Sequence, residues 1–340
     1  MHNNFKATIL GLAYADALGA GYEFFKGKIG EDEEIEFIEL PKITAHKKYE
    51  WTDDTAMAFL TLQAMKREIS NKDFRGLEVD YELLSQLFID WYKGAPDKGI
   101  HTYNVLSQTE AVKKANPEEE GVMARVAKEI TDANPMTAGN GGLMRIAAGV
   151  FLLKNTSMTD DLTIMKTASE LNNLTHPHFD SESCSRLFLF LLNAIIKENN
   201  DAYSKGVRTK NEFDRFIRHW LKELEAGKLG ESIIKALTDD LNTLNPNKYV
   251  ITTLCLAIGA IYQTWEDGIS PKDHYINTVH KCIQVGDDTD TTSAVAGAMV
   301  GAIYGEECLP DDVDKIFGYA GEKYSHVTYE DMVKTIDELL

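Results

Sequence analysis

The chain has 340 residues, 44% of them hydrophobic and 26% charged, so it can bury a large core without disulfide or metal staples. Its formal net charge of −19 argues against a general nucleic-acid or anionic-membrane binder, because both of those surfaces are negative themselves. The four cysteines are scattered and form no CxxC pair, which argues against a zinc site or a disulfide framework and favours a reducing compartment.

The first predicted element is an N-terminal helix in "GLAYADALGAGYEF", residues 11–24. Asp16 and Glu23 lie seven residues apart and so share one helical face, although a core helix with two solvated acids explains them as well. The stretch "KATILGLAYADALGAG" loosely imitates a signal peptide, but Asp16 interrupts its apolar run and Glu23 follows too soon for a cleavage region. The apolar run Ser293–Tyr304 falls short of the roughly 20 residues that a membrane span needs. We therefore expect a soluble cytoplasmic protein.

A short strand and a second helix are predicted next. Alternating apolar residues in "EIEFIEL", Glu34–Leu40, indicate a strand, and apolar residues at helical spacings indicate a helix over Thr55–Ile69. The preceding "EWTDDTAMAF" makes Thr52 the expected N-cap, with Asp53 and Asp54 in the first turn, where the helix dipole favours negative charge. Helix capping alone explains this pattern. Two adjacent carboxylates and a hydroxyl are also the oxygen ligands that Mg²⁺ selects.

The middle of the chain carries a glycine-rich turn in "TAGNGGLMRIAAG", residues 137–149. Its GNGG run can turn backbone amides outward, ahead of a predicted helix whose N-terminus attracts anions and whose first turns contain Arg145. This pattern is typical of a phosphate-binding loop, and an ordinary loop is the equal alternative.

Helical patterns dominate the rest of the chain. Phe213–Leu224 is amphipathic, residues 251–265 are apolar almost all round, and Ser270 is the expected N-cap of a helix that begins at Pro271. No linker divides the sequence. We therefore predict an all-α fold in a single domain, residues 1–340, with a peripheral helical excursion at about 199–228.

The last motif is "GDDTDTTSAVAGAMVGAIYG", residues 286–305, in which three aspartates precede a tightly packed helix. Asp287, Asp288 and Asp290 repel one another, and a helix N-terminus worth about half a charge compensates them poorly. A bound cation is the better explanation. Because two helix starts present Thr/Asp clusters, the sequence favours a binuclear Mg²⁺ or Mn²⁺ centre between facing segments.

These motifs together resemble the ADP-ribosylglycohydrolase family. "GLAYADALGAGYE", "WTDDTAM", "GNGGLMR", "LTHPH" and "GDDTDTTSAVAGAMVGAIYG" occur in the family's order, and the resemblance extends from about residue 5 to 320. The family includes ADP-ribosyl-arginine and ADP-ribosyl-serine hydrolases and dinitrogenase-reductase-activating glycohydrolases. The resemblance implies a compact all-α orthogonal bundle around a central binuclear metal site. It also implies hydrolysis of the bond between the C1″ carbon of ADP-ribose and an acceptor.

The resemblance also implies roles for particular residues. The ligands of the two divalent cations would be Thr52, Asp53, Asp54, Asp288, Asp290 and Thr291. The catalytic residues would be Glu23, Asp53 and Asp288, with Asp16 supporting the site from behind. The substrate-binding residues would be Gly139, Asn140, Gly141, Gly142, Leu143 and His176, where a satisfied loop histidine is the alternative for His176.

Three stretches depart from the family pattern. Ala15 stands where a glycine is usual, and one methyl group there should be tolerated. Asp287 replaces a second glycine, which costs energy if that position needs a positive φ. "PDKGIHTYN", residues 96–104, matches only loosely, so contacts to the leaving group are uncertain there.

The implied reaction leaves several questions open. The ions would grip the distal ribose and activate water, and carboxylates would stabilise oxocarbenium character at C1″. The substrate would be an ADP-ribosylated protein or a small conjugate, with arginine, serine, acetyl, a second ADP-ribose or a base as acceptor; the charge disfavours nucleic acid. The alternatives are a non-catalytic ADP-ribose binder or structural relative, and a Mg²⁺-dependent phosphohydrolase of nucleotide diphosphates.

Overall fold

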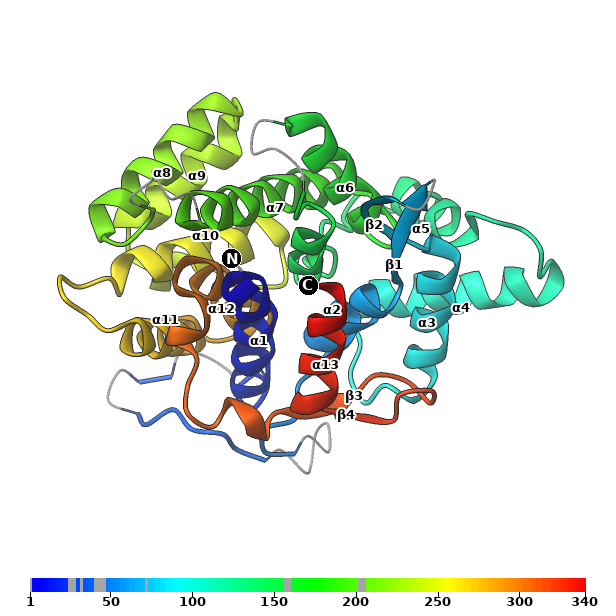
Figure 1. The fold of residues 1–340 in the computed structure, drawn as a ribbon, viewed down its shortest axis with the longest axis horizontal. Helices are drawn as coiled ribbons and strands as arrows, with labels where there is room; N and C mark the ends of the chain where they lie inside the picture. Colours follow the sequence, from blue (N-terminus) through cyan, green and yellow to red (C-terminus); the bar gives the residue numbers. More distant parts are fainter. Residues whose placement is uncertain are drawn as a thin grey trace.

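The computed structural model describes residues 2–23, 29–30, 33–39, 47–70, 73–155, 160–200 and 206–340. Helices fill most of this part of the chain, and the two sheets within it have two strands each (Figure 1). The predicted all-α class is confirmed. No helix in the described ranges has both the length and the apolar character that crossing a membrane requires.

The elements follow one another in a simple order. The longer helices are α1 (His2–Gly19), α2 (Asp53–Gln63), α3 (Tyr81–Gly94), α4 (Ile100–Ala115), α5 (Val122–Ala133), α6 (Asp161–Asn173), α7 (Phe179–Asn200), α8 (Lys210–Glu223), α9 (Gly227–Thr238), α10 (Val250–Gln263), α11 (Pro271–Val285), α12 (Thr289–Tyr304) and α13 (Tyr329–Leu339). The 3₁₀ turns are η1 (Ile146–Phe151), η2 (Leu241–Thr243), η3 (Gly305–Cys308) and η4 (Val313–Lys315). The strands are β1 (Met65–Ser70), β2 (Asp73–Val79), β3 (Phe317–Tyr319) and β4 (His326–Thr328).

Helices α1 and α12 form the closest pair in the centre of the molecule (Figure 1). They run antiparallel, because Gly11 meets Gly297 while Gly301 meets the backbone of Ala7. A Cβ at Gly11 would lie 2.6 Å from the carbonyl oxygen of Gly297, so only glycine permits this approach. The antiparallel pairing places the C-terminal end of α1 beside the acidic N-terminus of α12.

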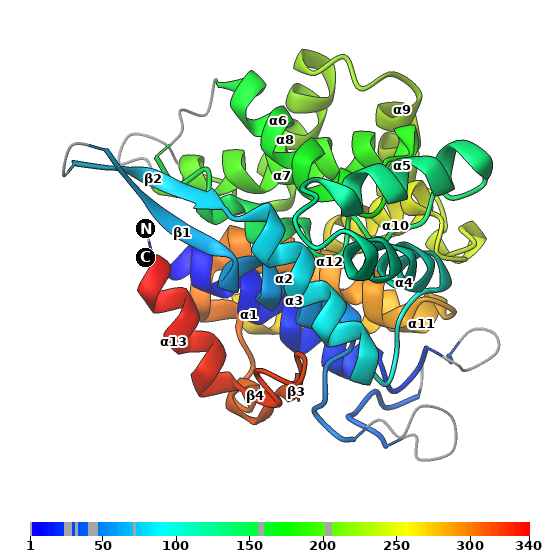
Figure 2. The same cartoon turned by 90° about the vertical axis from the view of Figure 1, so that its right-hand side faces the viewer.

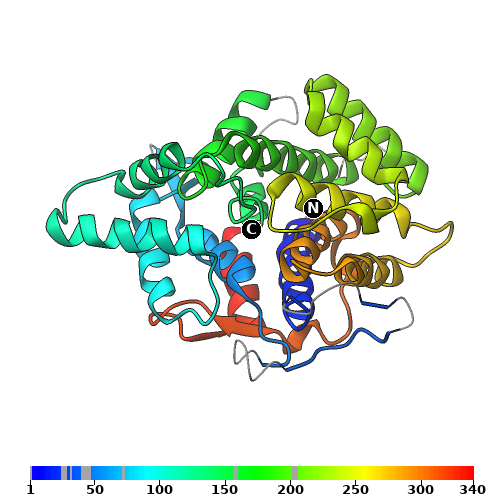
Figure 3. The same cartoon turned by 180° about the vertical axis from the view of Figure 1, so that it is seen from behind.

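The remaining helices surround this pair. Residues from Phe5 to Ile336 join one continuous hydrophobic cluster, to which α7, α10 and α11 contribute heavily. Helix α10 is buried along most of its length, as its apolar sequence predicts. Seen from behind, α8 and α9 lie at the edge of the molecule (Figure 3). Phe213 and Ile217 of α8 are nevertheless buried in the common cluster, and the proposed domain organisation stays a prediction.

Local capping signals are confirmed at α11. The Ser270 side chain accepts a hydrogen bond from the backbone N–H of Asp273, and Pro271 occupies the first turn. The amphipathic stretch Phe213–Leu224 likewise lies within α8 and its C-cap.

The predicted strand at Glu34–Leu40 is wrong for the residues that are described. Glu34–Glu39 form no ladder, and Leu40 lies outside the described ranges. Ile35 and Phe37 are buried while Glu36 is exposed, so the alternation reflects an extended segment lying on the helices. It has no neighbouring strand to pair with among the described residues.

The predicted helix over Thr55–Ile69 is also wrong at its end. Helix α2 ends at Gln63, and Met65–Ser70 pairs antiparallel with Asp73–Val79 in a bulged hairpin that projects from the helices (Figure 2). Pairing with a later segment outweighs the helical spacing of the apolar residues.

Candidate metal centre and active site

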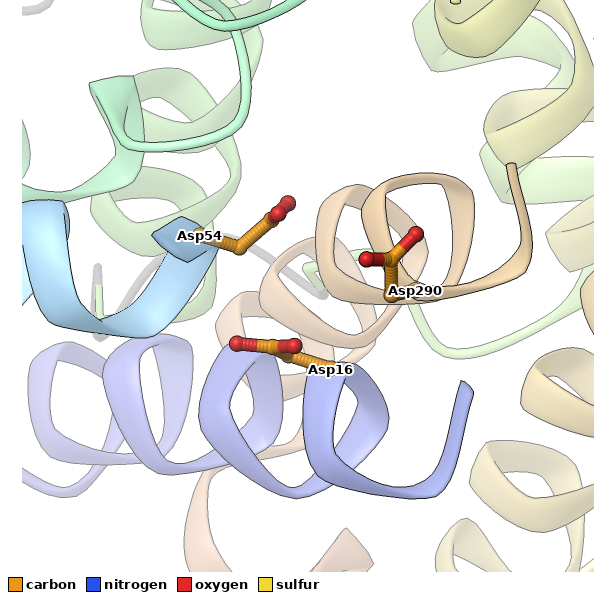
Figure 4. A group of neighbouring side chains, drawn as sticks. All are labelled: Asp16, Asp54 and Asp290. Carbon is orange, nitrogen blue, oxygen red and sulfur yellow. The ribbon is translucent and has the colours of Figure 1, made fainter. Parts of the chain in front are cut away.

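Three helices bring carboxylates to one point at the centre of the molecule. Asp16 comes from α1, Asp54 from the start of α2 and Asp290 from the first turn of α12 (Figure 4). One oxygen from each lies within 4.8 Å of the others. Segments more than 230 residues apart in the sequence therefore meet here, because α1 and α12 pack antiparallel and α2 starts against α1.

Asp290 also belongs to two further groups of acids. One contains Glu23 and Asp288, and the other contains Asp53 and Asp97, again with carboxylate oxygens within 4.8 Å of one another. An arrangement in which one carboxylate is shared by several clusters can hold more than one cation. Glu23 lies in the turn after α1 and not on the predicted continuous helix, because α1 ends at Gly19.

Asp16 has its hydrogen-bonding capacity filled by the start of α2. It accepts hydrogen bonds from the backbone N–H and hydroxyl of Thr52, the latter at 2.7 Å, and from the backbone N–H and hydroxyl of Thr55, the latter at 2.5 Å. Thr52 is the N-cap residue as predicted, but its hydroxyl makes no side-chain cap and donates to Asp16 instead. Asp16 therefore ties α1 to α2 from behind the site.

Asp54 and Asp290 each keep an oxygen without a partner. Asp54 Oδ1 and Asp290 Oδ1 are buried and have no hydrogen-bond partner among the described residues. Thr291 Oγ1 donates to the other Asp54 oxygen at 3.3 Å. Neighbouring buried carboxylates with unpaired oxygens are unfavourable alone, and carboxylate oxygens are the ligands that a hard divalent cation takes. The residues present therefore fit such an ion.

The pKa values of the clustered carboxyls also indicate a site for a cation. Burial, followed by the charge of Asp290, raises the pKa of Asp16 and of Asp288 to about 7 and that of Glu23 to about 10. Burial and the neighbouring carboxylates raise the pKa of Asp54 well above its ordinary value. In the absence of a divalent cation, Asp16, Asp54 and Asp288 therefore hold protons near neutral pH, whereas a divalent cation would favour their ionised forms.

The glycine-rich turn lies against the acids. The Asn140 side-chain amide donates to Asp288 Oδ2 at 2.5 Å and to Thr253 Oγ1 at 2.9 Å. A cavity of about 740 Å³ opens beside the turn, and Gly139 lines it together with Ile100, Met136 and Tyr249.

The helix predicted to follow the turn is wrong. Residues 141–145 form turns that lead into the 3₁₀ segment η1, and Leu143 is buried in the hydrophobic core. Arg145 is buried as well, and its guanidinium donates to the carbonyls of Gly141 and Leu171 and to Thr175 Oγ1. These bonds hold the turn in its non-helical shape.

His176 packs directly on the glycine turn. A Cβ at Gly141 would lie 2.6 Å from His176 Cε1, so the close approach requires glycine. His176 Nδ1 lies 2.8 Å from Thr175 Oγ1, and burial lowers the pKa of His176 well below its ordinary value. The neutral ring therefore faces the turn, and its role in substrate binding stays a prediction. His178, at the rim of the same cavity, contacts the carbonyl of Pro135.

Comparison with known proteins gives the chain its family. The protein-family model described as ADP-ribosylglycohydrolase matches residues 1–335. The chain belongs to the ADP-ribosylglycohydrolase family. It is 23% identical over 318 residues to an ADP-ribosylarginine hydrolase Tri1 of Serratia proteamaculans, covering 90% of this chain and 72% of that protein. It is 24% identical over 336 residues to the ADP-ribosylhydrolase ARH3 of Xenopus tropicalis, covering 91% and 89%.

A solved structure shows the same fold. The chain superposes on an "ADP-ribosylglycohydrolase-related protein complex" with a TM-score of 0.64 at 20% identity, covering 99% of this chain and 97% of that one. The all-α fold is therefore the fold of the ADP-ribosylglycohydrolase family.

Two residues that lie at the candidate site, Asp97 and Lys248, were not predicted from the sequence. Asp97 lies in the loosely matching stretch at 96–104 and joins Asp53 and Asp290. Lys248 Nζ lies 2.6 Å from Glu23 Oε1 and 4.0 Å from Asp288 Oδ1. A lone charged residue in a loop carries no local pattern, so only the fold brings these two to the acids.

Two of the three departures from the ADP-ribosylglycohydrolase pattern, Asp287 and Ala15, can be assessed from the backbone and packing. Asp287 has a φ of 58°, so the position does adopt the conformation that favours glycine. Ala15 is fully buried, and its methyl group would lie 2.7 Å from a Cβ at Gly297, so the helices accommodate it only because Gly297 has none.

Proposed function

We propose that this chain is a divalent-cation-dependent hydrolase of the C1″ glycosidic bond in ADP-ribose attached to a protein side chain or a small acceptor. Free ADP-ribose is the product. The observation that carries the proposal is the meeting of Asp54 and Asp290, each with an unpaired buried oxygen, beside Glu23. Membership of the ADP-ribosylglycohydrolase family supports hydrolysis of ADP-ribose linkages.

Two Mg²⁺ or Mn²⁺ ions are the proposed cofactors. The proposed ligands are oxygen donors from the two helix starts: Thr52, Asp53, Asp54, Asp288, Asp290 and Thr291. When bound, such ions stabilise negative charge on oxygen and lower the pKa of water.

Glu23, Asp53 and Asp288 form the proposed catalytic set. Glu23, which shares a carboxylate group with Asp288 and Asp290, is placed to accept the proton of the attacking water or to pass a proton to the leaving group. Asp53 and Asp288 contribute negative charge that stabilises the oxocarbenium character developing at C1″. Asn140 fixes the orientation of the Asp288 carboxylate through its hydrogen bond.

The substrate's phosphates are assigned to the glycine turn. The proposed phosphate contacts are the backbone N–H groups of Gly139, Gly141, Gly142 and Leu143. Gly139 is partly exposed, whereas Gly141 and Gly142 are buried and the Leu143 side chain is in the core. The neutral His176 ring lies behind the same turn. The cavity of about 740 Å³ beside Gly139 is large enough for the rest of a nucleotide.

A panel of ADP-ribosylated arginine, serine and acetyl conjugates, assayed with Mg²⁺, Mn²⁺ or a chelator, tests this function. We expect release of ADP-ribose that requires the metal, and loss of turnover by at least about 10³-fold in Asp53→Ala and Asp288→Ala with the fold intact. AMP and ribose phosphate as products would instead indicate cleavage of the pyrophosphate. Binding of ADP-ribose without turnover of any conjugate would indicate a non-catalytic relative.

A further inference from the structure

Lys248 is held in an unusual backbone conformation at the edge of the acidic centre. Its φ of 66° lies in the left-handed region, which disfavours side chains with a Cβ. Its carbonyl accepts a hydrogen bond from the backbone N–H of Asn140, and Gly139 pairs with Tyr249 in an isolated bridge. The loop before α10 is therefore fastened to the glycine turn, and this fixes the point from which the Lys248 side chain extends.

The side chain reaches over the acids from that point. Its ammonium forms a 2.6 Å ion pair with Glu23 and lies 4.0 Å from Asp288, and both carboxylates are almost fully buried. The Lys248 side chain itself is 59% exposed, and it also lines the cavity of about 740 Å³. The ammonium thus stands between the acidic centre and open space.

We propose that Lys248 is a tethered cation that competes with the divalent ion for Glu23 and Asp288 and withdraws toward the cavity when the ion binds. This inference rests on the divalent site of the proposed function. Glu23, Asp288 and Asp290 form one of the carboxylate groups that can hold an ion, and Lys248 occupies the open side of that group.

The physical reason is the repulsion between like charges in a poorly solvated place. An ammonium and a divalent cation that share two carboxylates lie within a few ångströms of each other, where water screens them only in part. The long, half-exposed lysine stem can move its charge outward by rotating about single bonds, whereas the buried carboxylates cannot follow it. Part of the binding free energy of the ion is therefore used to displace the ammonium.

Titration calorimetry of the full chain with MgCl₂ and with MnCl₂ tests the proposal. We expect Lys248→Met to bind the ions about tenfold more tightly than the wild type, because the competing charge is gone and the stem is kept. Lys248→Arg keeps the charge and should stay close to the wild type. In a Glu23→Gln background the effect of Lys248→Met should shrink, since the shared carboxylate is lost.

Lys272→Met is the matched control. Lys272 also pairs with a carboxylate, Asp311 at 2.5 Å, but it lies at the start of α11, about 20 Å of helix away from the end that leads into the acids. It changes the net charge equally and should leave ion affinity unchanged. Circular dichroism and urea unfolding of each variant verify the fold.

The outcomes separate this inference from the proposed function. Wild-type protein that binds the ions while Lys248→Met binds them equally or more weakly overturns the role of Lys248 alone. An equal gain in Lys272→Met assigns the effect to overall charge and also overturns it. Wild-type protein that binds neither ion overturns the divalent site and this inference together.

Discussion

Asp287 holds a strained backbone conformation immediately before the acids of α12. Its φ of 58° is tolerated by aspartate better than by most residues, but glycine adopts it freely. We expect Asp287→Gly to raise the free energy of unfolding by roughly 0.5–1 kcal/mol, measured by urea denaturation in EDTA.

Asp287→Ala separates the backbone effect from the charge effect. Alanine removes the carboxylate but keeps the Cβ, so it should be about 1 kcal/mol less stable than the glycine variant. Equal stability of the two variants would mean that the charge of Asp287, and not its φ, lowers the free energy of unfolding.

The tautomer of His176 follows from a short chain of hydrogen bonds. Arg145 can only donate, so Thr175 Oγ1 accepts from it at 2.7 Å, and the contact to His176 Nδ1 is the remaining place for the hydroxyl hydrogen among the described contacts. The neutral imidazole then carries its hydrogen on Nε2, which faces the glycine turn.

Thr175→Val should remove the hydroxyl that links Arg145 to His176 by hydrogen bonds, while keeping the shape of the side chain. We expect a mixture of His176 tautomers in ¹⁵N-edited NMR spectra and ADP-ribose binding weakened about fivefold, the equivalent of one hydrogen bond. Thr175→Ser keeps the hydroxyl and should resemble the wild type. An unchanged tautomer in the valine variant contradicts the assignment.

At the scale of elements, the α1–α12 contact sets the spacing of the acids. A Cβ at Gly19 would lie 2.5 Å from the carbonyl oxygen of Thr289 and 2.7 Å from the Cα of Asp290. Gly19→Ala should therefore push the start of α12 away from α1. We expect a loss of about 1–3 kcal/mol in unfolding free energy. We also expect at least about tenfold weaker Mn²⁺ binding by calorimetry, because the shared Asp290 moves.

Gly301→Ala is the comparison at the other end of the same contact. Its Cβ would overlap the carbonyl oxygen of Ala7, far from the acids along α12. It should destabilise the protein and leave Mn²⁺ affinity of the folded protein unchanged. Equal weakening of Mn²⁺ binding in both variants would mean that lost stability, and not the position of Asp290, is the cause.

Local chemistry decided which elements could be predicted from the sequence. The starts of α2 and α11 follow the expected N-cap residues, Thr52 and Ser270, and both helices begin directly after them. The end of α2 was missed because Met65–Ser70 becomes a strand only by pairing with Asp73–Val79. The spacing of apolar residues within Met65–Ser70 does not indicate this pairing, so it could not be predicted from that segment alone.

The same distinction applies to the candidate site. Thr52 and Asp290 stand in dense motifs, so their likeness to metal-binding segments could be noticed, although their roles as ligands stay a prediction. Asp97 and Lys248 are single charges in loops, and their place depends on how α1, α10 and α12 pack. The role of Asn140 in substrate binding stays a prediction, and its hydrogen bond to Asp288 could not be read from the local sequence.

At the scale of the whole molecule, a net charge of −19 is combined with several acids buried together. The folded-state pKa values of Asp16 and Asp288, about 7, lie above the ordinary 3.8, and the pKa of Asp54 is likewise raised well above 3.8. The metal-free folded state therefore binds more protons than the unfolded chain. These groups add stability that is complete below pH 3.8 and is lost as the pH rises through 7 and, for Asp54, through its raised pKa.

Buried histidines and cysteines change the stability of the protein mainly outside the range from pH 6.5 to 8.0. Burial lowers the pKa of His101, His176, His274 and His280, so their stabilising effect is lost only as the pH falls below about 6.5. Burial raises the pKa of the cysteines, whose ordinary value is 9.0. Between pH 6.5 and 8.0 the buried carboxyls therefore dominate the pH dependence of stability.

The melting temperature in EDTA should fall by about 3–5 °C between pH 6.5 and 8.0, measured by calorimetry. Saturating Mg²⁺ or Mn²⁺ should remove this fall, because an ion bound to the ionised carboxylates stabilises the folded state most where protons no longer neutralise them. Asp290→Asn should flatten the EDTA curve, since the Asp290 charge contributes to the raised pKa of Asp16, Asp54 and Asp288. A melting temperature in EDTA that stays constant or rises over this range would show that the acids are not held together unpaired, and the ion would then have no unsatisfied charge to relieve.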